Sequence, residues 1–513
     1  MRQPTEAILK RSDKAYARKD QWRGIVEDCY EFGLPQRNLL DGSYEGHAPG
    51  QSKQERVFDS TAVTSTLAFA NRIQSTLFPP YRNWCRLVAG DMIPEEQRDD
   101  VQRALDIYNE TFFNALRQTN FDLAMSEFLL DLCVGTAVML VLPGDESRPV
   151  RFETVPASLV ALEEGPHGKI DNVYRKIRLK GEAIIQQWPD AKFDDAFARR
   201  VEDHPADDFD LLEATVFVPA DGYYCYHVIE PKTRTEIVYR EMAKTPWVVG
   251  RYMKVAGEIY GRGPLVSALP DIKTLNATMR MVLQNMSLDL GNMWTAADDG
   301  VLNPNTITIT PGAIIPVARN GGPQGPSLMP LPRSGQFNSS QVNIDRLVIS
   351  IKKTLLDDTL PSDTMSARSA TEVQARMSEL ASNMGAAFGR LIAEVMLPIV
   401  DRTLQVLDQQ NLIDLPLQID GQQVKVVPIS PLAKAQNSNE LEGVLQFTQM
   451  MQGLGQAGMM AVNVDGLIAF VADRLGVPAR VVTTKEERQQ IMAEVASVAQ
   501  QGMQQPEEGA PLQ

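Results

Sequence analysis

Residues that commonly carry enzyme chemistry are scarce in this sequence of 513 residues. There are four cysteines, which lie far apart and show no CxxC spacing: Cys29, Cys85, Cys133 and Cys225. We therefore expect neither a disulfide framework nor a zinc site. There are also only four histidines, and they are scattered: His47, His167, His204 and His227. A catalytic or metal-binding cluster built from them is not the expected outcome.

Sequence motifs for catalysis are lacking as well. The chain has no GxxxxGK[ST] motif, so it is not the nucleotide-hydrolysing motor of any assembly that it joins, and it has no GxSxG, HExxH or EF-hand loop. Two acidic pairs, Asp298-Asp299 and Asp357-Asp358, are of the type that two-metal nucleases use. A turn and a helix end explain them better. We predict no catalytic, cofactor-binding or metal-binding residues.

Long apolar runs and excess positive charge are absent too. The most apolar segment, 128–142, contains Asp131 and Gly135 and is too short to span a membrane, so we interpret it as a buried helix end that continues into a strand. No signal peptide is visible, and no membrane contact is expected. The net charge of −15 argues against tight, sequence-reading DNA binding. It remains compatible with a channel through which DNA passes without being gripped.

Helical periodicity is what the chain does have, above all between residues 339 and 411. A helix is predicted over 339–358, followed by the polar hinge TLPSDTMSAR at 359–368. A capping box at Ser369 then starts a helix that extends to about Asn411 and would be roughly 60 Å long. Pro398 is expected to kink this helix rather than end it. A rod of this length suits a wedge-shaped subunit of a large ring better than a globular enzyme.

The rest of the chain predicts an α+β protein that is mainly α-helical. Helices are expected over 5–33 and from residue 57 to Pro79. The middle third predicts an antiparallel sheet, with strands at 136–142, 150–155, 172–179, 213–218, 223–229 and 236–241. The acidic segment 189–213 between them is expected to be rich in loops.

A second long helix is predicted over 265–293, and the Gly261-Arg-Gly263 sequence before it is interpreted as a flexible entry, since a lone glycine pair is no dinucleotide fingerprint. Residues 294–337 are rich in Pro, Gly, Asn and Thr and predict an extended insertion with a strand at 306–310. A hairpin is expected over 417–428 across Asp420-Gly421. Helices are expected near the C-terminus at 437–452, 464–475 and 485–500. Methionines 450, 451, 459 and 460 are expected to be core more than partner surface.

Four stretches in this order carry a family resemblance: VFDSTAVTSTLAFANRIQSTLFPPYRNWCRL, YGRGPLVSALPDIKTLN, DDGVLNPNTITITPGAI and SARSATEVQARMSELASNMG. With them the chain resembles the portal, or head-to-tail connector, proteins of short-tailed bacteriophages over about residues 5–495. The resemblance implies a portal-type fold with wing, stem, clip and crown regions. Its boundaries are expected as follows: 1–262 wing, 263–293 first stem helix, 294–338 clip, 339–358 second stem helix, 359–368 channel loop, 369–436 long kinked wing helix and hairpin, 437–496 helical crown and 497–513 disordered tail.

The resemblance also implies a function. Portal proteins form closed rings, normally dodecamers, at one capsid vertex of the virion, after assembly in the host bacterial cytoplasm. DNA is packaged through the ring by the terminase and is ejected through it into the tail. The implied partners are other copies of the chain, double-stranded DNA that passes non-specifically, the large terminase subunit, the tail adaptor, the major capsid protein and the scaffold.

Two groups of candidate residues follow from this anatomy. Candidates that face the DNA in or beside the channel loop are Thr359, Ser362, Asp363, Thr364, Met365, Arg368, Lys352 and Lys353. Candidates for terminase or adaptor docking on the clip are Asn303, Asn305, Thr306, Arg319, Asn320, Gln324 and Arg333. The basic residues could equally be ordinary surface or inter-subunit charge.

Two other classes of protein remain as alternatives. One is another structural virion protein without a DNA channel, either a coat protein or an internal ejection protein. The other is an enzyme such as a nuclease or protease, for which the sequence offers no convergent acidic or histidine cluster. A stable ring with a central hole would separate the portal interpretation from both.

Overall fold

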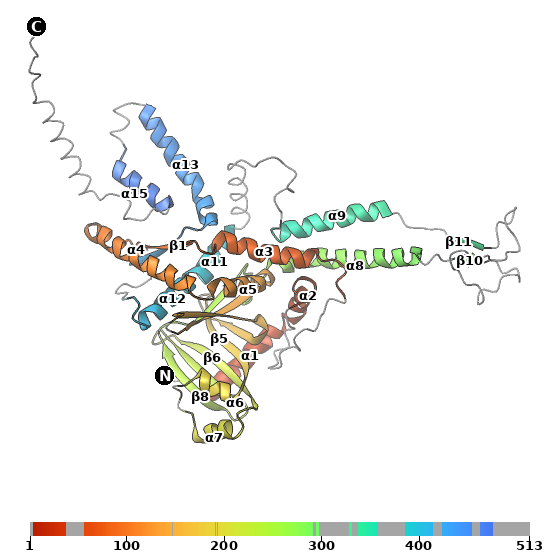
Figure 1. Ribbon diagram of the computed structural model, residues 1–513, viewed down its shortest axis with the longest axis horizontal. Helices are drawn as coiled ribbons and strands as arrows, with labels where there is room; N and C mark the ends of the chain where they lie inside the picture. Colours follow the sequence, from red (N-terminus) through yellow and green to blue (C-terminus); the bar gives the residue numbers. More distant parts are fainter. Residues whose placement is uncertain are drawn as a thin grey trace, which may run out of the picture.

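The computed structural model describes residues 4–36, 56–145, 147–189, 191, 193–290, 294–296, 328–330, 337–357, 385–413, 423–453 and 462–475. These residues form a body of helices and two main sheets (Figure 1). A hairpin of two helices, α8 and α9, projects from one side of the body, while α13 and α15 stand away from it on another side. The predicted α+β class with mainly helical content is confirmed.

A five-stranded antiparallel sheet forms the lower part of the body in Figure 1. Its order is β4 (Val160–Glu164), β5 (Ile170–Lys180), β6 (Asp208–Val218), β7 (Tyr223–Glu230) and β8 (Thr235–Met242). Successive side chains of each strand point to opposite faces of the sheet, and helices cover both of these faces. Helix α1 (Thr5–Asp20) covers one face, with Ile8 and Tyr16 against Tyr174. Helices α6 (Gly181–Gln187) and α7 (Asp195–Asp203) cover the other face.

The loop-rich interpretation of 189–213 is wrong at two places, since α7 lies within this segment and β6 already begins at Asp208. Phe197 and Val201, one helical turn apart on α7, are buried against the sheet. Two well-placed apolar side chains therefore determine the local structure, although acidic residues dominate the composition. The short strand β4 was not predicted either.

A three-stranded sheet in the order β3-β2-β9 lies deeper in the body. It comprises β2 (Thr136–Pro143), β3 (Val150–Val155) and β9 (Trp247–Arg251). Helix α5 (Phe121–Val134) leads directly into β2 across Gly135, which confirms the predicted helix-to-strand transition. Met139 packs into the main helical core, while its neighbour Leu140 packs between the two sheets. Burial on both faces explains why this segment is so apolar.

The strand β12 (Val424–Pro428) lies where the second strand of the hairpin over 417–428 was predicted, while the first strand lies outside the described residues. Strand β12 pairs antiparallel with β1 (Cys85–Ala89), from Cys85 opposite Pro428 to Ala89 opposite Val424. Val424 and Leu87 are buried, so this distant pairing completes the core beside α3 (Thr61–Leu77) and α4 (Glu95–Arg117). The turn signal Asp420-Gly421 lies outside the described residues.

The long helix is described from Gly385 onward. It consists of α11 (Gly385–Leu391), a π-helical turn (Ile392–Met396) and α12 (Leu397–Gln409). As predicted, the helix continues through Pro398. The irregularity is the π-turn directly before it, and this wider turn accommodates the proline ring that would clash with the carbonyl of Glu394 in a regular α-helix. Residues 369–384, including the capping box, lie outside the described residues.

The C-terminal helices are α13 (Pro431–Gly453), which begins six residues before the predicted start, and α15 (Val464–Leu475). The core prediction is wrong for Met450, whose surface is 69% exposed. Leu445 and Phe447 on the same helix are about half exposed as well. The predicted helix at 485–500, the tail, Met459 and Met460 fall outside the described segments.

Candidate functional site: the projecting helical hairpin and its base

The hairpin pairs α8 (Pro264–Leu290) with α9 (Phe337–Thr354), which lie side by side in Figure 1. With 27 residues, α8 extends for about 40 Å. At the far end, β10 (Trp294–Ala296) pairs antiparallel with β11 (Leu328–Pro330). The structure thus agrees with the prediction of two helices on either side of an inserted segment.

The half of the hairpin nearest the body is firmly attached. Ile272 and Leu275 of α8 and Ile351 and Leu355 of α9 are buried in the main core. Ser350 Oγ donates a hydrogen bond of 2.7 Å to Asp271 Oδ2 across the two helices. Further contacts reach other parts of the body, since Lys273 pairs with Asp28 at 2.6 Å and Asn276 accepts from the backbone of Phe58 at 2.7 Å.

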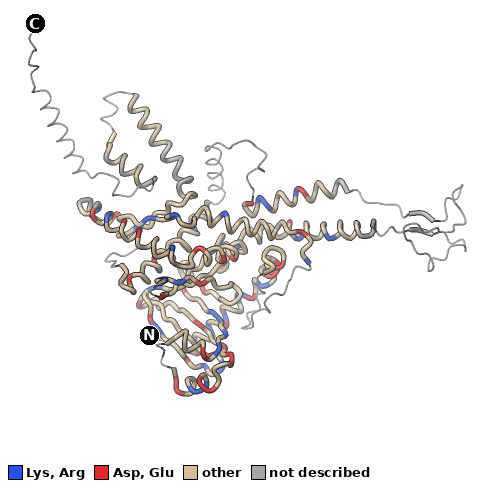
Figure 2. The backbone as a smooth tube through the Cα atoms, viewed as in Figure 1, with Lys and Arg blue, Asp and Glu red and all other residues tan. Residues whose placement is uncertain are grey.

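The hairpin also exposes apolar side chains, most of them on its outer half, with Ile349 nearer the base. They are Met281, Leu283 and Met286 on α8 and Val342 and Ile349 on α9. Met281 and Ile349 are 63% and 62% exposed. Figure 2 shows that most of the hairpin is uncharged, with basic and acidic residues interspersed rather than gathered on one side. These exposed apolar side chains are the part of the hairpin that another chain could cover.

The C-terminal end of α9 is fixed by its own backbone and by α3. Leu356 has a φ of +56°, and its N–H donates to Lys353 O at 3.2 Å, while the N–H of Asp357 donates to Lys352 O at 2.8 Å. These two bonds form a Schellman motif with a leucine in the left-handed position that glycine usually occupies. Ser65 Oγ of α3 donates to Asp357 Oδ2 at 2.7 Å, and Arg72 of α3 donates to Leu356 O. The base of the hairpin is therefore held at a defined point on α3.

We predict that Ser65→Ala lowers the free energy of unfolding by about 1–2 kcal/mol, because the partly buried Asp357 carboxylate loses a hydrogen-bond donor. Ser65 is fully buried, so water cannot replace the hydroxyl. Urea unfolding of the two proteins measures the difference. Ser75→Ala on the exposed side of the same helix is the matched control and should change the value by less than about 0.5 kcal/mol. Equal effects of the two substitutions would contradict this role of Ser65.

The glycines before α8 are not a flexible entry, which corrects that interpretation. The N–H of Gly263 donates to Val134 O at 2.8 Å, and the N–H of Gly261 donates to Thr136 Oγ1 at 2.8 Å. A Cβ atom on Gly263 would meet the carbonyl of Cys133 far inside the 3.0 Å that real Cβ contacts essentially never cross. The backbone entering α8 is therefore pressed against the junction of α5 and β2 at Gly135, and close packing is the reason for the glycines.

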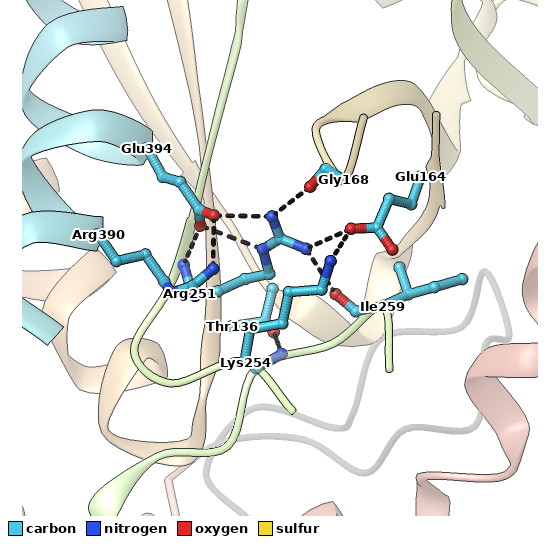
Figure 3. A network of polar contacts seen from close by, with 9 residues as sticks. Thr136, Glu164, Gly168, Arg251, Lys254, Ile259, Arg390 and Glu394 are labelled. Atoms are coloured by element: carbon cyan, nitrogen blue, oxygen red, sulfur yellow. Dashed lines mark hydrogen bonds and ion pairs between the residues drawn. The ribbon is translucent and has the colours of Figure 1, made fainter. Parts of the chain in front are cut away.

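Beside this junction lies a buried network of charged residues centred on Arg251, the last residue of β9 (Figure 3). Its guanidinium is 3% exposed and makes five hydrogen bonds, as many as it has N–H groups. Nε and Nη2 donate to the two oxygens of Glu394 in the π-turn at 3.1 and 2.7 Å. Nη1 donates to Glu164 Oε1 at 3.3 Å and to Ile259 O at 3.2 Å, and Nη2 also donates to Gly168 O at 3.0 Å. Burial by itself would lower the pKa of Arg251, but Glu394 and then Glu164 outweigh it and raise the pKa.

The site offers little for catalysis. Within the segments that the structure describes, no group of three or more His, Cys, Asp or Glu side chains could hold a metal ion. The four cysteines are free and buried. Burial raises the pKa of Cys29 to about 12 and the pKa values of Cys85 and Cys133 as well, which makes these thiols poor nucleophiles. Among the described helices, none combines the length and apolarity of a membrane span.

Few of the sequence-predicted site residues are described. Lys352 is half-buried and Lys353 is exposed, and both lie in the last turn of α9, where a positive charge is favourable at the helix C-terminus. The remaining channel-loop candidates, Thr359, Ser362, Asp363, Thr364, Met365 and Arg368, lie outside the described residues. So do the clip candidates Asn303, Asn305, Thr306, Arg319, Asn320, Gln324 and Arg333.

Comparison with known proteins decides the family. Residues 5–482 match the family described as "Bacteriophage head to tail connecting protein". The chain belongs to this family. As a head-to-tail connector it is a structural protein of the virion, and the comparisons give no support to a coat or internal ejection protein.

Curated relatives of the connector span nearly its whole length. It is 22% identical over 504 residues to the probable portal protein of Bordetella phage BPP-1, with 91% of this chain and 85% of the relative covered. It is 19% identical over 488 residues to the portal protein of Escherichia phage T7, with 91% and 87% covered. A chain in the virion of a native gene transfer agent particle matches at 13% identity with a TM-score of 0.36, over 83% of the connector and 92% of that chain.

Sequence reasoning missed the residues that position the connector's hairpin. Ser65 and Arg72 have no signal of their own, because serine and arginine are common on helices. Arg251 does have one, since it is a charged residue at the end of an otherwise apolar strand, WVVGR. Such a residue at a buried strand end indicates a buried partner, which could have directed attention to Glu394.

Proposed function

We propose that copies of this connector form a closed ring, normally a dodecamer, at one capsid vertex, and that the ring is the conduit for DNA during packaging and ejection. The observation that supports the ring most strongly is the projecting hairpin with its exposed apolar side chains. An isolated two-helix projection buries too little apolar surface to be stable by itself. Packing between neighbouring copies would cover these side chains, and cyclic symmetry would repeat the contact around the ring.

The regions keep the assignment proposed from the resemblance. Residues 1–262 would form the wing, 263–293 and 339–358 the two stem helices, 294–338 the clip, 359–368 the channel loop, 369–436 the long kinked wing helix and hairpin, and 437–496 the crown. The clip candidates would contact the large terminase subunit during packaging and the tail adaptor afterwards. The wing would contact the major capsid protein and the scaffold, and assembly would take place in the host cytoplasm.

DNA would pass beside the base of the stem. Lys352 and Lys353 are at the end of α9, directly before the channel-loop candidates, so a ring would carry a circle of positive charge at this level. The interspersed charges on the rest of the hairpin and the net charge of −15 favour weak, non-specific contact with phosphates. Weak contact suits a duplex that must move in both directions.

Negative-stain electron microscopy of the purified protein, with its native mass, tests the ring. We expect rings with an axial hole and a mass near twelve chains. A particle of one or two chains at every salt concentration would contradict the proposal. The ring number itself can differ from twelve without affecting the conduit, provided that the hole admits duplex DNA, which is about 20 Å wide.

The basic circle is tested by substituting Lys352→Ala and Lys353→Ala together. We expect intact rings that bind short DNA duplexes more weakly. The slope of log affinity against log salt should fall by about 0.9 for each phosphate contact that is lost. The pair Lys10→Ala and Lys14→Ala on the exposed face of α1 removes the same charge far from the hairpin and should leave the slope unchanged. Equal slopes for all three proteins would show that Lys352 and Lys353 are ordinary surface charges that do not contact the DNA.

A further inference from the structure

The charged network around Arg251 has an arrangement that simple charge pairing does not require (Figure 3). Each of its two carboxylates already has a cation of its own. Glu394 accepts from Arg390 Nη1 at 3.1 Å, and Glu164 accepts from Lys254 Nζ. Arg251 lies between the two pairs and bonds to both.

The two carboxylates belong to different parts of the fold. Glu164 ends β4 in the five-stranded sheet, and Gly168 is in the turn that joins β4 to β5. Glu394 is in the π-turn of the long helix. The third segment is the approach to α8, whose Ile259 carbonyl accepts from the same guanidinium. The Arg251 side chain thus bonds to the five-stranded sheet, to the long helix and to the entry of the hairpin.

The geometry of the guanidinium makes this connection specific. Its planar fork binds Glu394 through two parallel bonds, so the position of Glu394 depends on the orientation of the fork. The same plane also carries the bonds to Glu164, Gly168 and Ile259, so a shift of one partner tilts the donors that serve the others. The backbone N–H of Arg251 donates to Glu394 Oε2 at 3.1 Å as well, which ties β9 itself to the π-turn. π-turns are often found at functional positions of helices.

We propose that Arg251 couples the five-stranded sheet to the long helix and to the entry of α8, so that a displacement at the β4–β5 turn alters the stability of the π-turn, and the reverse. Such coupling is reciprocal by thermodynamic necessity. In a ring, a force applied to the five-stranded sheet would be transmitted through Arg251 to the stem helices. That use rests on the proposed function, whereas the coupling within one chain does not.

Hydrogen exchange of the full-length protein, read by mass spectrometry, tests the coupling with Glu164→Gln and Glu394→Gln. Both substitutions keep the shape of the side chain and remove its charge. We expect E164Q to speed exchange of the amides at 392–397, which it does not contact, by about threefold to a hundredfold, the range found for residues in one network. E394Q should speed exchange at 164–169 to a similar degree. Asp401→Asn is the matched control. Asp401 lies on the same long helix but outside the network, where it pairs with Lys244, so its substitution should leave exchange at 164–169 unchanged.

The role of Arg251 is tested by repeating both substitutions in Arg251→Met and Arg251→Lys backgrounds. Lysine keeps the charge but has no fork, and it also provides a folded protein if the methionine variant is unstable. In either background E164Q should no longer affect 392–397. The proposal is overturned if the effect of E164Q stays within 160–175 while Arg251 is present, or if it reaches the π-turn equally well without the arginine. Ring formation does not enter these measurements, so their failure would leave the connector function untouched.

Discussion

Replacing Gly263 with alanine is expected to lower the free energy of unfolding by more than about 4 kcal/mol, which is a large part of the roughly 5–15 kcal/mol by which most proteins are stable. The added Cβ would overlap the carbonyl oxygen and the carbonyl carbon of Cys133, and also the carbonyl carbon of Val134. All of these are backbone atoms at the end of α5, so no flexible side chain can move aside. To make room, α8 would have to leave the α5–β2 junction, and the hydrogen bond from Gly263 to Val134 would be lost.

Soluble yield, circular dichroism and urea unfolding report this effect. The matched control is Gly389→Ala in α11, where a Cβ atom would meet nothing within 4 Å. Alanine is favoured over glycine inside a helix, so the control should be neutral or more stable by up to about 1 kcal/mol. A Gly263→Ala protein with wild-type stability would show that the entry of α8 is loose after all.

Substituting Met281→Asp and Ile349→Asp together is expected to convert rings into single chains. Both side chains are exposed on the hairpin, Met281 on its outer half and Ile349 closer to its base, and neighbouring copies would cover them in the proposed ring. Each copy would then place two unpaired carboxylates in an apolar contact, and the closed ring repeats that penalty at every interface. Because the residues are exposed in the single chain, its own stability should change little.

Native mass spectrometry and analytical ultracentrifugation measure the loss of rings, and urea unfolding verifies that the subunit remains folded. Asn343→Asp adds a negative charge to an exposed position of α9 without removing an apolar contact, and it should leave the rings intact. If the double variant still assembles, the exposed apolar residues of the hairpin are not the inter-subunit contact, and another part of the chain must supply it.

The sequence predicts those elements whose pattern is local. Helix α9 carries its apolar stripe at regular spacing, and the strands of the five-stranded sheet alternate visibly, so both were predictable. The partner of β12 was not, because a nearby Asp-Gly turn signal suggested a hairpin, and nothing local indicates β1 as the partner. Gly263 shows the same limit, since the sequence reveals a glycine but not the carbonyl that makes it necessary.

The candidate site divides in the same way. Periodicity placed the two helices of the hairpin and their ends, and with them Lys352 and Lys353. The contacts that hold the base, Ser65 with Asp357 and Arg251 with Glu394, join residues more than a hundred positions apart. Only the folded chain brings such pairs together, and single polar residues carry no period from which to infer them.

The pairing of β1 with β12 also determines how late in synthesis the β1 edge can be covered. More than 300 residues separate Ala89 from Val424, and a ribosome adding 5–20 residues per second needs between about 15 s and a minute to make them. During that time the β1 edge that β12 will cover has no β12 to pair with, and an open strand edge is a template for pairing with other chains. Nascent connectors on one messenger are thus exposed to aggregation until the last fifth of the chain emerges. A chain that terminates before Val424 cannot close this edge, so premature products are expected to aggregate or be degraded rather than reach the native fold.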